Sequence, residues 1–176
     1  SRYIWWGQVL DFPDFRQSHT DLWQDLREDV FSTANIESVI NNFARQIDGR
    51  DPLGANDPEI GRSPAARNFD KWGQANHRNE VRILKNWLRT RVGWIDRQYT
   101  AKPRFSSTAP HVPPGLVDAG DELSFQASSV VFYTTDGSDP RAPGGDPSPE
   151  ALSANAGESI EIAGTTTVTA RARNGV

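Results

Sequence analysis

The chain has 176 residues, a net charge of -4 and 36% hydrophobic residues, with no cysteine and no methionine. This length is enough for one large domain or two small ones. The acidic balance argues against nucleic acid as the main partner, the lack of cysteine excludes disulfides and thiolate metal sites, and no apolar run is long enough to predict a membrane span.

Aromatic residues are dense at the N-terminus, where Trp5 and Trp6 lie within the sequence SRYIWWGQVL. So dense a cluster at a terminus indicates that residues 1–10 dock into a core. Asp11 can cap a helix that opens near Pro13, a residue suited to the first helical turn. We therefore predict that an amphipathic helix follows directly.

A second amphipathic pattern follows Ser32 or Thr33, either of which can serve as its N-cap, and this helix is predicted to end near Gly49. Residues 50–62 are rich in proline, glycine and aspartate and indicate a loop. Residues 63–72 begin with a Ser-Pro pair and predict a short helix.

The strongest helical pattern spans residues 80–96, with the sequence EVRILKNWLRTRVGWID. Its apolar residues recur at the spacing of one broad helical face, and most of its basic residues fall on the other side. A helix with two tryptophans on that face must pack against several other elements. We predict that all six tryptophans are structural core residues: Trp5, Trp6, Trp23, Trp72, Trp87 and Trp94.

The pattern changes after Tyr99, where a proline- and serine-rich connector begins, and beyond it apolar residues alternate with polar ones. Several short strands separated by turn signals are typical of a small β-sandwich. The predicted fold class is therefore α+β in two domains. We expect an all-α helical bundle at residues 1–100, a linker at 101–114 and an all-β module at 115–176.

Two segments carry a resemblance to a known family. RNFDKW at residues 67–72 and the sequence of residues 80–96 are similar to the end of the spore-coat CotH kinase family, which has RNF-x-KW followed by EV-x-x-LK-x-WL-x-x-R-x-x-W-x-D. DFPDFRQ at residues 11–17 and VFSTANI at residues 30–36 fit the same region. The resemblance implies that the helical domain is the tail of a kinase-like C-lobe.

The β-rich part resembles a second family. FYTTDGSDPRAPGG at residues 132–145 and TTVTARA at residues 166–172 are similar to the chitobiase/hexosaminidase C-terminal module, which has an Ig- or fibronectin-III-like sandwich fold. That module normally continues past NGV into one more strand. The resemblance implies that the sandwich lacks its last strand, which another chain could supply, and that the sequence is a piece of a longer protein.

CotH-type proteins resemble atypical protein kinases that use ATP and a divalent metal, and their nucleotide-binding and catalytic segments lie upstream of the region matched here. We therefore expect no cofactor site and no catalytic residue in this chain, and whether it belongs to an enzyme stays open. The sequence has neither GxxxxGK[ST] nor GxGxxG. His19, His77 and His111 are far apart, and each is interpreted as an isolated surface or loop residue.

Asp136 and Asp139 form the best acidic pair and are weak candidates for a calcium site. The alternative is a structural turn, because Asp-Gly and Asp-Pro are turn-forming pairs. Tyr133 is a possible ligand contact for a sugar, with Phe132 as the other candidate. Alternation along the strand sends one of these two rings into the core.

Three functions remain open. The first is a non-catalytic C-terminal portion of a secreted CotH-like kinase, acting as scaffold and spacer or docking module. The second is a structural or adhesive cell-surface or filament protein that assembles through its sandwich, and the third is a carbohydrate-binding accessory module. Expected partners are an upstream kinase-like lobe or neighbouring subunits, with a glycan as a further possibility. The expected location is extracellular or at the bacterial cell surface.

Overall fold

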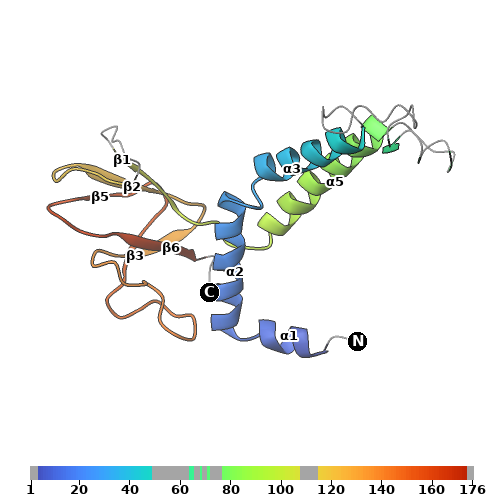
Figure 1. The fold of residues 1–176 in the computed structure, drawn as a ribbon. Coiled ribbons are helices and arrows are strands. Elements are labelled where there is room, and N and C mark those ends of the chain that lie inside the picture. Colours follow the sequence, from blue (N-terminus) through green and yellow to red (C-terminus); the bar gives the residue numbers. More distant parts are fainter. Residues whose placement is uncertain are drawn as a thin grey trace. The chain divides into compact units, whose positions relative to one another are not determined.

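The computed structural model describes residues 4–48, 64–65, 68, 71, 77–107 and 115–173, and the side chains of residues 4–6 are not among them (Figure 1). The fold is α+β, with four helices and two small antiparallel sheets in this part of the chain. Contacts divide the chain into two compact units. The strand unit comprises Ser1–Asp21 and Arg97–Val176, and the helical unit comprises Leu22–Asp96.

This grouping does not test whether residues 1–100 and 115–176 fold separately, so the two predicted domains stay predictions. The same holds for the predicted all-α bundle. The helix of residues Pro13–Glu28 crosses the boundary between the two units at Asp21.

Two helices begin where the sequence predicts. Helices α1 (Ile4–Leu10) and α2 (Pro13–Glu28) are followed by α3 (Thr33–Ile47) and α5 (His77–Asp96). Helix α2 opens at Pro13, and α3 is capped by the Ser32 hydroxyl, which accepts a hydrogen bond from the Asn35 amide. The start near Pro13 and the Ser32 cap are confirmed, whereas the capping role of Asp11 stays a prediction. Helix α1 was not predicted, because its aromatic cluster shows no clear period.

Helices α3 and α5 pack against each other in the helical unit (Figure 1). Val92 of α5 is buried, and Ile36 and Leu88 lie beside it in the same small cavity. Polar contacts flank this seam: Arg89 donates to Glu37 at 2.5 Å, and Lys85 donates to Asn41. The seam thus combines a narrow apolar strip with charged and polar edges.

The broad apolar face of α5 is only partly covered in this chain. Trp87 is 60% exposed and Trp94 is 46% exposed. Trp23 is half-buried. The indoles of Trp87 and Trp94 are thus only partly covered, and their role as core residues stays a prediction. The side chains of Trp5, Trp6 and Trp72 lie outside the described residues.

Six strands form two three-stranded antiparallel sheets in the described part of the strand unit. The first has the order β1 (Arg104–Ser107), β2 (Glu122–Gln126), β5 (Ser159–Glu161). The second has the order β4 (Leu152–Ala154), β3 (Val130–Thr134), β6 (Thr169–Arg173). In register, Phe105 lies opposite Phe125, and Phe132 lies opposite Arg171.

The two sheets share one core. Phe125 of β2 and Val131 of β3 are fully buried, and the Phe125 ring lies 4.9 Å from that of Tyr133. The alternation of apolar and polar residues in β2 agrees with the burial of Leu123 and Phe125. Two sheets packed on a common core agree with a β-sandwich. The finer fibronectin-III-like assignment stays a prediction.

Candidate functional site

Asp96 ends helix α5 and lies inside the CotH-like sequence pattern. Its carboxylate accepts a hydrogen bond from the Trp23 indole at 2.9 Å and from Arg27 Nε at 3.1 Å. Arg27 also donates to the carbonyl of Phe31, whose ring lies 5.8 Å from that of Trp23. This cluster ties the end of α5 to the second half of α2 within the helical unit. The final aspartate of the pattern therefore has a structural role here.

The strand unit contains a denser charged cluster centred on Arg171 of β6. Its guanidinium donates to both oxygens of Asp139, at 2.7 and 2.8 Å. It also donates to both oxygens of Asp21 on α2, at 2.9 and 3.1 Å. Two bidentate contacts on one guanidinium use the planar donor geometry of arginine on both sides.

These contacts shift the pKa values of their members. Hydrogen bonds from Arg171 hold the pKa of Asp139 below its ordinary value, against the opposing effect of burial. Burial raises the pKa of Asp21, but hydrogen bonds from Arg171 and Gln17 outweigh it and leave that pKa lowered. Hydrogen bonds to Asp139 and Asp21 raise the pKa of Arg171 further. All three groups are charged at neutral pH.

A second ion pair lies close by in the strand unit. Arg141 contacts the Asp14 carboxylate at 2.8 Å, and the amide of Gly144 donates to the same oxygen at 3.0 Å. The Gly144 and Arg141 hydrogen bonds lower the pKa of Asp14. The loop of residues 139–146 thus meets the first turn of α2 through backbone and side-chain contacts.

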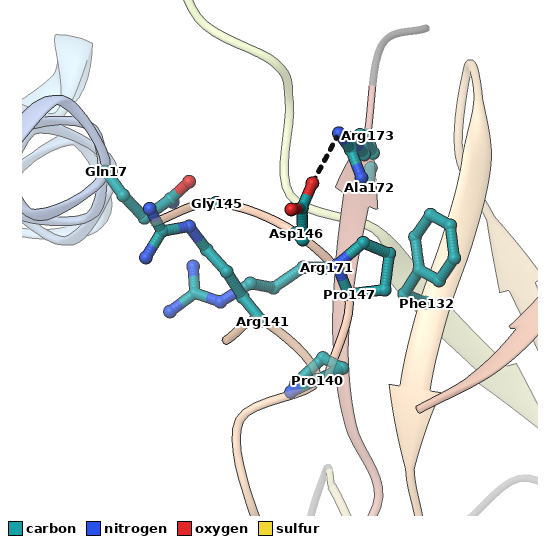
Figure 2. A pocket seen from close by; sticks show the side chains of 10 residues that line it. All are labelled: Gln17, Phe132, Pro140, Arg141, Gly145, Asp146, Pro147, Arg171, Ala172 and Arg173. Carbon is teal, nitrogen blue, oxygen red and sulfur yellow. Dashed lines mark hydrogen bonds and ion pairs between the residues drawn. The ribbon is translucent and has the colours of Figure 1, made fainter. Parts of the chain in front are cut away.

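A pocket of about 70 Å³ lies among these groups. In Figure 2 the side chain of Arg141 extends toward the helix that carries Gln17, while Arg171 and Arg173 project from β6. The pocket is much smaller than the roughly 300–1,000 Å³ of ordinary small-molecule sites. As it stands it cannot enclose a nucleotide or a sugar.

The predicted acidic pair lies at the edge of this cluster. Asp136 accepts from the amide and the hydroxyl of Ser138, at 2.9 and 2.6 Å, and Asp139 accepts from the amide of Arg141 at 3.0 Å. Both carboxylates therefore serve local turns, which supports the structural alternative. The calcium prediction stays untested, and no group of three or more potential metal ligands occurs among the described residues.

The two aromatic candidates for ligand contact are placed on opposite faces of β3. Tyr133 is 8% exposed and packs in the core, whereas Phe132 is half-buried and lines the small pocket. Alternation predicted that one ring would be buried. A sugar stacked on Tyr133 would need a ring face that the core already covers.

The predicted isolated histidines have different surroundings. The Tyr99 hydroxyl lies 3.0 Å from His19 Nδ1 within the strand unit. His77 Nδ1 lies 3.9 Å from Asp48 in the helical unit. His111 lies outside the described residues. His19 belongs to the strand unit and His77 to the helical unit.

A larger groove of about 760 Å³ lies beside β1 and β2. Its lining includes the apolar side chains of Phe105, Leu123, Ile162 and Val168. Residues 108–114, which are next to it in sequence, lie outside the described residues. The groove offers apolar surface and no cluster of reactive groups.

Sequence reasoning missed the Arg171 cluster. Arg171 and Asp21 are 150 residues apart, and neither lies in a local motif with the other. The only signal was that alternation in TTVTARA places Arg171 on one face of its strand. Nothing in the sequence identified its two partners.

Comparison with known families identifies the family to which residues 1–95 are similar. A family model described as CotH kinase protein matches residues 1–95. The chain belongs to this family. No curated protein and no solved structure matches the chain. The CotH resemblance is thereby confirmed, whereas the chitobiase-like assignment of the strands stays a prediction.

The likeness of the CotH family to atypical protein kinases implies ATP and a divalent metal. Magnesium in kinase-type sites is held by carboxylates together with substrate phosphates. Asp21 and Asp139 share one arginine, and Asp136 closes its own turn. These three carboxylates do not fit a nucleotide–metal site, because their oxygens already accept hydrogen bonds from arginine or from their own turn. No helix among these residues has the length and hydropathy needed to cross a membrane.

Proposed function

We propose that this chain supplies a non-catalytic structural portion of a CotH-like kinase. The helical unit would act as a scaffold that packs against a kinase-like lobe, and the strand unit would act as a spacer or docking module. The family match on residues 1–95 supports the first part of the proposal. The observation that carries it is the apolar surface that α3 and α5 leave uncovered.

Each of these helices presents a row of exposed apolar side chains in addition to their shared seam. On α3 the row is spaced every four residues, which places it on one helical face. Members of the two rows that are at least 44% exposed are Val39, Phe43, Ile47, Ile83, Leu84, Trp87 and Trp94. Large exposed apolar surfaces mark sites of protein interaction. The partner that the family match favours is the kinase-like lobe of a CotH-family protein.

The absence of catalysis is tested on the purified chain. We expect no magnesium-dependent turnover of ATP and no saturable ATP binding, because Asp21 and Asp139 are already paired with Arg171 and Asp136 with its own turn. Hydrolysis that saturates with ATP, and disappears when magnesium is chelated, would overturn the proposal.

The scaffold role is tested in a CotH-family protein that carries this segment within a longer chain. Replacing Phe43 and Trp87 with glutamine should lower its soluble yield and its activity together, because polar groups would replace buried apolar contacts. Ser38→Gln, on an exposed polar position of α3, is the matched control and should change neither. If the double variant also behaves like wild type, the apolar rows do not pack against a lobe.

The finer description of the strand unit also belongs to this proposal. A fibronectin-III-like sandwich is supported by two antiparallel sheets on one core and by the turn at Asp136 and Gly137. An extracellular or cell-surface location is proposed with it. Secretion of the whole protein, detected by surface labelling of intact cells, tests the location.

A second candidate, assembly through the sandwich, is favoured by the edges of the two sheets. In the described residues β1 and β6 are each hydrogen-bonded to one neighbouring strand. Such edges can accept a strand from another chain. Filaments seen by electron microscopy of the purified chain would support this role, and their absence at high concentration would count against it.

A further inference from the structure

Residues 13–21 of α2 contact the loop and strand of residues 139–171 at two separate points, both inside the strand unit. At one end Asp14 meets Arg141 and the amide of Gly144. At the other end Asp21 meets Arg171. The spacing of two helical turns places both acidic residues on the same side of α2. The helix therefore presents two carboxylates to two arginines.

Asp139 contacts both arginine residues from within the strand module. It accepts from the backbone amide of Arg141 and holds the Arg171 guanidinium by two hydrogen bonds, so this loop carboxylate orients the Arg171 side chain and the backbone at Arg141. The exposed fractions of the Arg141 and Arg171 side chains are 17% and 29%. Preorganised and partly buried arginines lose less side-chain freedom on pairing than freely exposed ones.

Close backbone packing accompanies the ion pairs. A Cβ atom built on Gly145 would lie 3.4 Å from Pro13 Cβ, at a backbone φ of 108°. Gln17 lies between the two acidic residues, donates to Asp21 at 2.7 Å and lines the same pocket as Arg171 (Figure 2). The contact is thus a continuous surface, since it includes apolar and neutral polar groups between its charged ends.

We propose that residues 13–21 are a docking surface for the strand module, held by the pairs Asp14–Arg141 and Asp21–Arg171. These residues belong to the segment that matches the CotH kinase family, whereas both arginines lie beyond it. The module is therefore fastened to the kinase-like segment by a specific interface, and the connector of residues 101–114 is not its only attachment. Isolated exposed ion pairs contribute little, but bidentate arginine contacts in a network are the exception.

The experiment uses the whole chain, which has no cysteine of its own. Cysteines replace the exposed residues Ser18 on α2 and Ser153 on β4, and spin labels on them report the distance between helix and module. We expect one narrow distance distribution at low salt. It should broaden in about 1 M NaCl, where the Debye length falls to about 3 Å and attraction between charges is weakened.

Two variants test whether the ion pairs are the cause of the narrow distance distribution. Asp14→Asn combined with Asp21→Asn should broaden the distribution at low salt, because the arginines lose both helical carboxylates. Glu150→Gln removes one exposed carboxylate outside the contact and should leave the distribution narrow. A second label pair at Ser128 and Ser153 lies within the module, and its unchanged distance shows that the module stays folded in every variant.

Two results would overturn the proposal. The first is a broad distribution for the wild-type chain at low salt, which would mean that helix and module are not docked. The second is a narrow distribution in the double variant, which would mean that the two ion pairs do not hold the contact.

Discussion

Gly137 occupies the tight turn after β3, and its backbone shows why glycine is needed there. Its φ is 84°, a conformation that side chains with a Cβ rarely adopt. A Cβ at this position would lie 3.2 Å from Thr167 Cγ2. Both the backbone and the neighbouring segment therefore oppose substitution.

We predict that Gly137→Ala lowers the free energy of unfolding of the strand unit by about 1–2 kcal/mol, the ordinary cost of a left-handed alanine. Urea unfolding followed by hydrogen exchange of the β3 amides measures it. Gly164→Ala is the matched control, because Gly164 has no positive φ and no atom within 4 Å of the added Cβ. Equal losses in the two variants would contradict this explanation.

Acid should weaken the Arg171 cluster. The folded-state pKa values of Asp21 and Asp139 are lowered, so the unfolded state binds protons first as the pH falls. Their stabilising contribution is complete above the unfolded pKa of about 4 and is lost as the pH falls through the lower folded values. The Asp139 carboxylate faces Arg171 and Arg141. The Asp21 carboxylate faces Arg171, Gln17 and the negative charge of Asp139, which opposes the lowering of its pKa.

We predict that Asp139→Asn is less stable than wild type at neutral pH and loses less stability on acidification. In this variant a neutral asparagine replaces the carboxylate that accepts hydrogen bonds from Arg171. The midpoint of urea unfolding, measured for wild type and for the variant from pH 7 down to about pH 3, gives the slope of stability against pH for each protein. Glu150→Gln, which removes a carboxylate outside the cluster, should follow the wild-type slope. An Asp139→Asn slope as steep as wild type would refute the assignment.

At the level of single residues, the sequence was informative where the chemistry is local. The turn at Asp136 and Gly137 could be predicted because both residues act on their own backbone. The partners of Arg171 could not, because they come from a loop 32 residues away and a helix 150 residues away. Whether Tyr133 or Phe132 is buried depended on the register of β3, which the apolar run Val130–Tyr133 does not fix.

Among the elements, α3 shows how a single cap defines a boundary. The Ser32 hydroxyl accepts a hydrogen bond from the Asn35 amide, one of the helix N–H groups that have no partner inside the helix. We predict that Ser32→Ala destabilises the helical unit by about 1 kcal/mol. Circular dichroism during thermal unfolding measures the change.

Ser38→Ala is the control for this substitution. Ser38 lies in the middle of α3 and is exposed, where alanine is the better helix former. We expect no loss of stability there. If both serine variants were equally destabilised, the loss would come from the changed side chain and not from the cap.

Elements with a clear period and a cap were predictable, and short elements without them were not. Helix α5 begins at His77, three residues before the predicted start, and ends at Asp96 as predicted. Strand β4 has three residues, Leu152–Ala154, and was missed because so short a segment carries no usable alternation. Its place in the sheet depends on pairing with β3, which is a tertiary contact.

At the scale of the whole molecule, the sequence indicated the helix-rich and strand-rich halves but not their contacts. Residues up to Asp21 group with the strands, although their sequence is helical. The pairs that join them to the strands are separated by well over one hundred residues, beyond the range of any periodicity. The same limit applies to Trp87, because a helical pattern identifies an apolar face but not what covers it.

The uncovered rows on α3 and α5 determine how the whole chain should behave in solution. Exposed apolar surface of this extent favours association. Light scattering of the purified chain should show a mass that rises with concentration. Phe43→Gln with Trp87→Gln should shift the chain toward monomer without loss of helix content, because these side chains are 58% and 60% exposed and lie outside the seam around Val92. Ser38→Gln should keep the wild-type association. A wild-type chain that stays monomeric at every concentration would show that these rows do not drive contacts between molecules.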